Sequence, residues 1–136
     1  TAVTLSAAAN EGSTFIGWKP ASPTCTGTDP CTVTIDKAKT IQAIFVGDYT
    51  LKVTTQSKKK GSGTVTSIPI GINCSTGSKE GCTATYPYAE QVVLSATPDS
   101  DSTFLGWRPV KLCTGTGVCI VPMDKKRTIK AVFSGD

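Results

Sequence analysis

Side chains that could carry out chemistry are few in this chain, because its 136 residues include no histidine. A serine or cysteine nucleophile needs a base beside it, so the usual histidine-based triads cannot be built, although lysine stays formally open as a base. Glycoside hydrolysis needs two placed carboxylates, and the candidate pairs are Asp99 with Asp101 and Asp36 with Asp124. Asp36 and Asp124 each precede a lysine in a turn-like stretch, which favours turn capping. We therefore predict that the chain is not an enzyme.

Binding sites for ions, cofactors and nucleic acid are also poorly supported. Asp99-Ser100-Asp101 could hold calcium weakly, but a turn is the simpler interpretation. Asn73-Cys74-Ser75 fits a glycosylation acceptor, although its central cysteine is expected to be bridged. The three lysines Lys58–Lys60, beside Gly61-Ser62-Gly63, favour a solvated turn over a phosphate patch. We predict no cofactor, no metal and no nucleic-acid partner.

The six cysteines fall into three closely spaced pairs, each enclosing a turn-rich loop. With no histidine to share a zinc site, the cysteines favour disulfides over metal, and hence an oxidising compartment. Six cysteines allow 15 connectivities, and local pairing is the simplest of them. A redox pair is disfavoured because it usually has the CxxC spacing. The predicted bridges are Cys25 with Cys31, Cys74 with Cys82, and Cys113 with Cys119.

Aromatic residues are the remaining candidates for contacts, because exposed Trp and Tyr rings can stack on sugars. The phrase STFIGWKP at residues 13–20 returns as STFLGWRP at residues 102–109. By simple alternation, position 15 in this strand faces away from positions 16 and 18, and both faces are apolar. This pattern predicts a strand covered on both sides, with both tryptophans in the core. Tyr86 and Tyr88 lie on a connection between strands and are the predicted exposed contacts. The predicted core aromatics are Phe15, Trp18, Phe45, Phe104, Trp107 and Phe133.

The repeated phrase belongs to a longer internal duplication. Residues 3–48 align with 92–136 after a one-residue deletion, and just over half of the aligned residues are identical. Residues 49–91 have no second copy. Residues 49–136 therefore read as one complete repeat, with 49–91 as its first half and 92–136 as its second half. Residues 1–48 read as the second half of another repeat, so that apolar strands there would lack their partners.

The elements that position these residues read as strands joined by tight turns. Alternation of period two marks the segments 49–54, 92–97 and 128–133. No segment longer than a turn reads as helix, and no apolar run approaches the roughly 20 residues of a spanning helix, so no membrane insertion is expected. Pro122 removes a backbone donor and predicts an edge strand. The expected fold class is all-β, with tandem small antiparallel modules that are β-grasp-like or sandwich-like and stapled by disulfides.

The motifs in this order resemble the divergent internalin-type B-repeat, a bacterial surface repeat. The resemblance rests on VVLSA, STFLGW, the Cys-bounded loops, the Asp-Lys turn and TIKAVF in the second half, and on YTLKVTTQ, GSGTVTS and the middle Cys pair in the first. It spans essentially the whole chain. It implies an all-β module of a secreted or surface-anchored protein that acts as a stalk or adhesive element.

Three functions follow as hypotheses. The first is a non-enzymatic extracellular structural or adhesive module of a bacterial surface or secreted protein, whose partners are other repeats, other copies of the chain, or a surface glycan or protein. The second is a filament subunit that completes residues 1–48 by strand addition from another copy. The third is a carbohydrate-binding module. The chain opens at Thr1 without a signal region, so we expect a mature product, a proteolytic piece or an excised segment.

Overall fold

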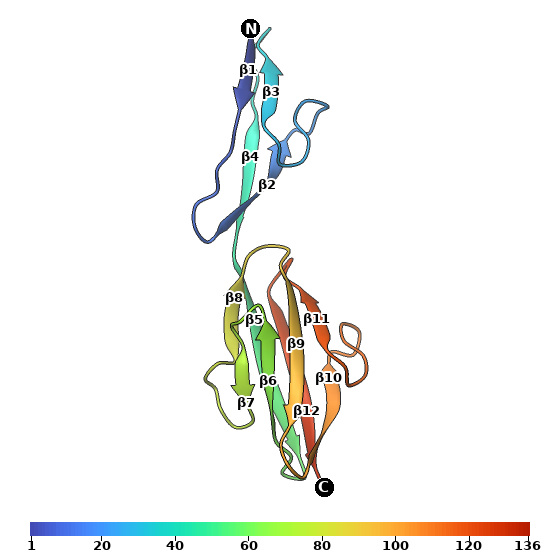
Figure 1. Ribbon diagram of the computed structural model, residues 1–136. Helices are drawn as coiled ribbons and strands as arrows, with labels where there is room; N and C mark the ends of the chain where they lie inside the picture. The colour runs from blue at the N-terminus through green and yellow to red at the C-terminus, as the bar shows by residue number, and fades with distance from the viewer. The chain divides into compact units, whose positions relative to one another are not determined.

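A computed structural model describes all residues, 1–136, and contains strands and turns but no helix. The chain divides into two compact units, Thr1–Asp48 and Tyr49–Asp136, called unit 1 and unit 2 below (Figure 1). The all-β prediction is confirmed. The strands of unit 1 are β1 (Ala2–Leu5), β2 (Ser13–Lys19), β3 (Cys31–Thr34) and β4 (Gln42–Gly47). Those of unit 2 are β5 (Tyr49–Lys58), β6 (Gly63–Ile68), β7 (Asn73–Ser75), β8 (Thr83–Tyr86), β9 (Gln91–Pro98), β10 (Ser102–Arg108), β11 (Cys119–Pro122) and β12 (Arg127–Gly135).

Unit 2 is built from two four-stranded sheets that share one hydrophobic core. Their strand orders are β10-β12-β5-β8 and β11-β9-β6-β7. Residues 49–91 supply two strands to each sheet, and residues 92–136 supply the other two. The two halves of the sequence are therefore interleaved into one sandwich, and neither half forms a complete sheet by itself.

The pairing in unit 2 is antiparallel with one exception. β12 and β5 run parallel, from the pair Arg127 and Leu51 to the pair Ser134 and Lys58. This pair joins the two halves of the repeat in the first sheet, and the antiparallel β6–β9 pair joins them in the second. With two stacked sheets and no helix, unit 2 is the sandwich-like form of the predicted module. β11 lies at a sheet edge, as Pro122 predicted.

The core of unit 2 draws on both halves. Of its 18 buried apolar residues, seven come from residues 49–91. Leu51 and Val53 of β5 alternate inward with polar neighbours, as the period-two pattern predicted. Ile129, Ala131 and Phe133 of β12 also face inward and are each 0% exposed, but the intervening Val132 is buried as well, at 1%. Burial of apolar area on this scale is the main stabilising contribution to the unit.

The phrase STFxGW forms β2 and β10, but simple alternation describes these strands incorrectly. A bulge lies between Phe104 and Gly106, so that Leu105 is an extra residue and Phe104 and Trp107 face the same side. Their rings meet edge to face at 4.9 Å. Leu105 points outward and is 43% exposed. The prediction that this strand is covered on both sides is therefore wrong.

Unit 1 has the same bulge and the same aromatic pair, but only half of the sheets. Its strands form two separate two-stranded sheets, β1-β3 and β2-β4. Only four residues form its buried cluster, Trp18, Cys25, Cys31 and Val33. The predicted core residue Phe45 is 45% exposed, so that prediction is wrong for this unit. Phe45 packs on Phe15 at 5.3 Å, and Phe15 is itself only partly buried.

Candidate functional site: the open face of unit 1

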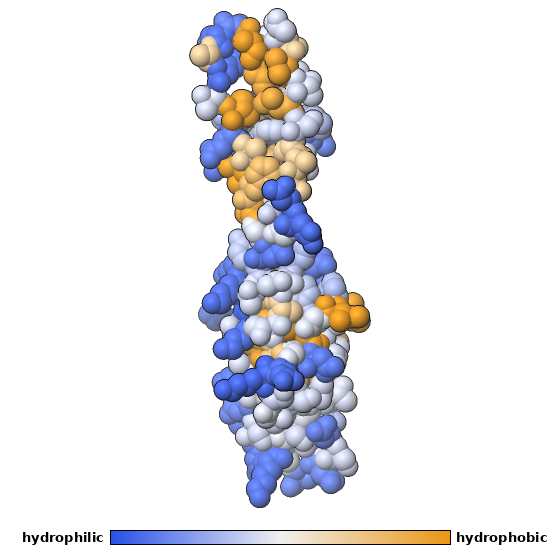
Figure 2. All heavy atoms as spheres, turned by 90° about the vertical axis from the view of Figure 1, so that its left-hand side faces the viewer, coloured by the Kyte–Doolittle hydropathy of each residue, from blue (hydrophilic) through white to orange (hydrophobic).

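Three apolar positions of unit 1 are exposed although their counterparts in unit 2 are fully buried. Val3, Ile35 and Phe45 are 39%, 49% and 45% exposed. The equivalent residues Val92, Met123 and Phe133 are each 0% exposed. We call the surface formed by Val3, Ile35 and Phe45, with the partly buried Leu5, Ile41 and Ala43, the open face. Figure 2 shows apolar surface spread over unit 1, whereas unit 2 is mainly white and blue in that view.

One pair of positions shows that this difference is specific to the open face. Ile16 of unit 1 and the equivalent Leu105 of unit 2 are 37% and 43% exposed. Both are the outward residue of the bulge. A residue that faces solvent in the complete unit also faces solvent in the incomplete one. The open face is therefore the set of positions that residues 49–91 would cover, and it is not a general loss of packing.

Unit 2 shows how that cover is built. The Phe133 ring lies against the backbone of β6, where a Cβ added to Gly63 would collide with the ring. Met123 exchanges backbone hydrogen bonds with the connection before β9, donating to Glu90 O at 2.9 Å and accepting from Ala89 N at 3.0 Å. In unit 1, Ile35 N donates to Thr1 O at 2.9 Å. This bond is the counterpart of the Met123–Glu90 bond, and it is the one of the two that unit 1 has.

The backbone of unit 1 is open at the matching edges. β4 pairs with β2 on one side, but the side on which β12 binds β5 has no strand. β1 pairs with β3, but the side on which β9 binds β6 has no strand. Both strands are also shorter than their counterparts, because the segments Ser6–Ala9 and Lys39–Ile41 are not in strand conformation. Unpaired edges of this kind bind added strands readily.

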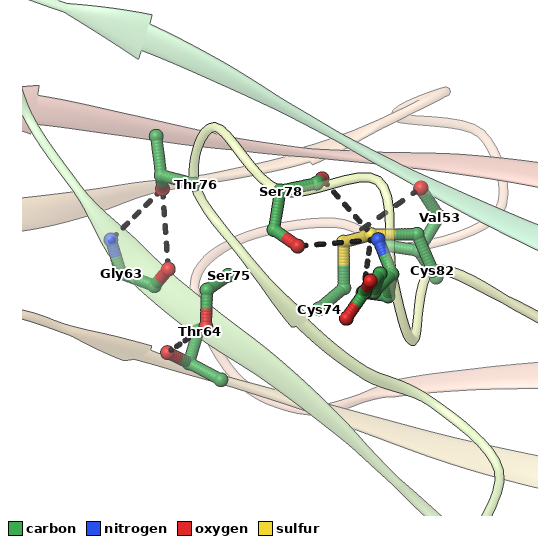
Figure 3. The surroundings of a disulfide bond; sticks show 9 residues. Val53, Gly63, Thr64, Cys74, Ser75, Thr76, Ser78 and Cys82 are labelled. Carbon is green, nitrogen blue, oxygen red and sulfur yellow. Dashed lines mark hydrogen bonds between the residues drawn. A yellow bond between two sulfur atoms is a disulfide. The ribbon is translucent and has the colours of Figure 1, made fainter.

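The cysteines form the three predicted local disulfides, and no cysteine is free. The Cα atoms of Cys25 and Cys31 lie 4.5 Å apart, those of Cys74 and Cys82 4.7 Å, and those of Cys113 and Cys119 5.3 Å. Figure 3 shows the middle disulfide, with Cys82 Sγ 3.4 Å from the Ser78 carbonyl. Each bridge closes a short loop, of sequence separation 6 or 8, and so reduces the conformational freedom of the unfolded chain.

The loop closed by Cys74 and Cys82 is further held to β6. Thr76 N donates to Gly63 O at 3.0 Å, and Gly63 N donates to Thr76 Oγ1 at 3.0 Å. The hydroxyls of Thr64 and Ser75 lie 3.1 Å apart (Figure 3). These hydrogen bonds fasten the short strand β7 to the sheet. The first half of the repeat thus carries its own internal connections.

Each tryptophan anchors the Cys-bounded loop of its own unit. Trp18 Nε1 donates to Asp29 O at 2.9 Å, and Trp107 Nε1 donates to Gly117 O at 2.7 Å. The two rings are 8% and 1% exposed. The indole nitrogen of each is therefore satisfied inside the fold, and little of either side chain is exposed.

The predicted exposed contact at Tyr86 is wrong. Tyr86 is 3% exposed, and its hydroxyl lies 2.9 Å from Ser67 Oγ in a buried hydrogen bond. It ends β8 and faces inward because β8 pairs with β5 in the register that sets Tyr86 opposite Tyr49. Tyr88 is partly buried, and its ring centroid lies 6.4 Å from that of Tyr49.

The carboxylates considered as catalytic pairs lie in turns. Asp36 pairs with Lys39 at 3.5 Å, and the equivalent Asp124 pairs with Arg127 at 2.7 Å. Asp101 adopts a left-handed conformation in the turn closed by Ser102 N donating to Asp99 O at 3.0 Å. No group of three or more acidic, cysteine or histidine side chains is arranged to hold a metal ion. No helix in the structure has the length and apolarity to cross a membrane.

These features define the class of protein: a disulfide-stapled, all-β repeat with one eight-stranded unit and one four-stranded unit. The comparisons with known proteins agree. The chain matches the divergent InlB B-repeat domain over residues 1–48 and 49–136, and it therefore belongs to that family. Members of this family are typically structural, which indicates a bacterial surface repeat module. No curated protein and no solved structure matches the chain. The disulfides and the family are compatible with an extracellular or surface location.

Proposed function

We propose that the chain is a non-enzymatic, extracellular structural module that carries mechanical load at a bacterial surface. The observation that carries the proposal is the parallel pairing of β5 with β12. These are the first and last strands of unit 2, and they are direct neighbours in one sheet.

This pairing places the ladder in shear when unit 2 is pulled through its ends. Because β5 and β12 run parallel, the start of β5 at Tyr49 and the end of β12 at Gly135 lie at opposite ends of their ladder. A force applied between them acts along the strands and loads all eight residue pairs together. A force applied at one end of the ladder would instead break its hydrogen bonds one after another. Simultaneous loading raises the barrier to forced unfolding, and that barrier governs resistance to force.

The disulfides support the same role. Cys74–Cys82 and Cys113–Cys119 lie within unit 2 and close loops of sequence separation 8 and 6. Residues inside a closed loop cannot extend under force, so an unfolded unit lengthens less. Each bridge also reduces the entropy of the unfolded chain. For rings of this size, this raises the free energy of unfolding by about 2 to 3 kcal/mol.

Single-molecule pulling of unit 2 tests the proposal. We expect a higher unfolding force when the unit is held at residues 49 and 136 than when it is held at residues 58 and 135. The second pair lies at one end of the β5–β12 ladder, so it opens the ladder bond by bond. Equal forces in the two geometries would contradict the load-bearing role. Reduction of the disulfides should lengthen the extension released on unfolding.

Assembly between copies is a second candidate function, favoured by the exposed apolar residues and the unpaired edges of unit 1. In the simplest form of such assembly, copies would exchange their first halves. The number of first halves limits this exchange. Residues 1–136 contain two second halves, 1–48 and 92–136, but one first half, 49–91. Exchange of first halves among copies of residues 1–136 would therefore leave one second half per copy unfilled. A mass-resolved size measurement that finds only monomer at high concentration would rule this candidate out.

A further inference from the structure

We propose that unit 1 is an acceptor for a first-half segment supplied from outside residues 1–136. The occupant is a stretch with the pattern of Tyr49–Gln91, which would add one strand beside β4 and one beside β1. This inference goes beyond the load-bearing role and does not depend on it. It assigns an interaction surface, the open face, and the chemistry of the partner that fits it.

The side chains of the open face match a surface that is seen covered in the same molecule. Leu5, Ala43 and Phe45 are identical to their counterparts Leu94, Ala131 and Phe133. In unit 2 these counterparts form one core with Leu51, Val53 and Val65 from the first half. Identical apolar residues on equivalent strands present the same shape to an incoming segment. Burying them again removes apolar surface from water, which favours association.

The backbone edges set the direction and register of the added strands. In unit 2, Ile129 lies opposite Val53 in the parallel ladder, and Leu94 lies opposite Ser67 in the antiparallel one. By equivalence, a β5-like strand would run parallel to β4 with its Val53 position opposite Ile41. A β6-like strand would run antiparallel to β1 with its Ser67 position opposite Leu5. Both strands come from one continuous segment, so a single partner fills both edges.

The first half already present in the chain cannot serve unit 1. Parallel neighbours in a sheet need a crossover connection of a dozen residues or more. Only Asp48 separates β4 from β5. β5 therefore cannot turn back to lie parallel to β4, whereas the long connection through residues 59–126 allows it to lie parallel to β12. Chain connectivity therefore requires residues 49–91 to pair within unit 2. The edges of β1 and β4 in unit 1 stay unpaired.

Two short segments of unit 1 are expected to become strand when the acceptor is filled. Ser6–Ala9 and Lys39–Ile41 are not in strand conformation. Their counterparts Ser95–Pro98 and Arg127–Ile129 are strand and pair with β6 and β5. In unit 1, no neighbouring strand is present to accept or donate backbone hydrogen bonds to these segments until a partner binds. Their ordering gives a signal that is specific to unit 1.

The test uses the full chain, isotope-labelled for NMR, and an unlabelled segment of residues 49–91 with the Cys74–Cys82 bridge formed. We expect saturable binding of one segment per chain, with shifts confined to unit 1 and strongest at Ser6–Ala9 and Lys39–Ile41. Phe45→Lys should weaken binding about tenfold or more, because it would bury a charge without a partner. Val3→Lys, at a second exposed position, should do the same.

The matched control is Ile16→Lys, which should bind as the unchanged chain does, because its counterpart Leu105 stays exposed in the complete unit. The assignment would be overturned if the segment did not bind, or if the Phe45 and Val3 variants bound it as tightly as the unchanged chain does. NMR shift changes in unit 2 would overturn it as well. Self-association of the chain that Phe45→Lys abolishes, without binding of the segment, would make the occupant a second copy and would also overturn it. Force measurements on unit 2 are unaffected by any of these outcomes.

Discussion

At the scale of residues, the repeated phrase STFxGW forms a platform for the Cys-bounded loop. Trp107 donates to the Gly117 carbonyl, and Gly106 lies beneath the Gly115 carbonyl, which a Cβ would approach to 3.0 Å. Trp18 and Gly17 make the equivalent approaches to Asp29 and Gly27. The phrase occurs twice because each unit has such a loop to hold.

Trp107→Ala should lower the free energy of unfolding of unit 2 by about 3 to 5 kcal/mol, because it removes a buried ring and leaves a cavity. The matched control is Leu105→Ala, two residues away and 43% exposed, which should cost less than about 1 kcal/mol. Denaturant titration followed by circular dichroism measures both. Equal costs for the two variants would show that the indole is not a core element.

Gly106→Ala should destabilise unit 2 by about 1 to 3 kcal/mol, because Gly106 has a φ of 132° that side chains other than glycine rarely adopt. The added methyl would also press on the Gly115 carbonyl. Gly117→Ala is the control, since a Cβ there meets nothing within 4 Å. Thermal unfolding compares the two, and a loss at Gly117 as large as that at Gly106 would contradict the close approach.

The sequence predicted the burial of the tryptophans but not the shape of their strand. Period-two alternation assigns Phe104 and Trp107 to opposite faces, because their separation is odd. The extra residue at Leu105 restores them to one face. A bulge has no dependable residue pattern of its own, although glycine directly after an apolar residue in a strand is a sign of one. Tyr86 was misassigned for a related reason, since its inward direction depends on the β8 register.

At the scale of elements, strands were predictable where both edges are filled. The alternation identified the inward residues of β5, and those of β12 except for Val132, which it assigned to the outer face although this residue is 1% exposed. The predicted core position of Phe45 in unit 1 is wrong, because its burial needs a second sheet half that residues 1–48 do not contain. The parallel β5–β12 pair was also beyond sequence patterns, since alternation does not report strand direction.

Replacing Cys74 and Cys82 by alanine should lower the stability of unit 2 by about 2 to 3 kcal/mol, through the greater entropy of the unfolded chain. Replacing Cys25 and Cys31 should affect unit 1 alone, because that ring lies within Thr1–Asp48. Unit-resolved unfolding by NMR separates the two effects. Alkylation of the native chain before reduction should label no thiol, and labelling of any cysteine would contradict the three bridges.

At the scale of the whole molecule, the two units should differ in stability. Unit 2 buries 18 apolar residues in its core cluster and unit 1 buries four. We expect two calorimetric transitions, with unit 1 unfolding at the lower temperature. The excised residues 49–136 should show the upper transition alone. If the full chain shows a single transition and the excised residues 49–136 show none, the division into independent units would be contradicted.

The central claim is that unit 1 has only the second half of the repeat, whereas unit 2 has both halves. Amide hydrogen exchange at equivalent positions of the two units tests this claim most directly. Within Ser95–Thr97 and Thr128–Ile129, the amides that donate to β6 and β5 should be strongly protected, because these strands pair there. Those of Ser6–Ala8 and Thr40–Ile41 should exchange rapidly in the chain alone and become protected when the 49–91 segment is added. Equal protection at the two sets of positions in the chain alone would contradict the claim.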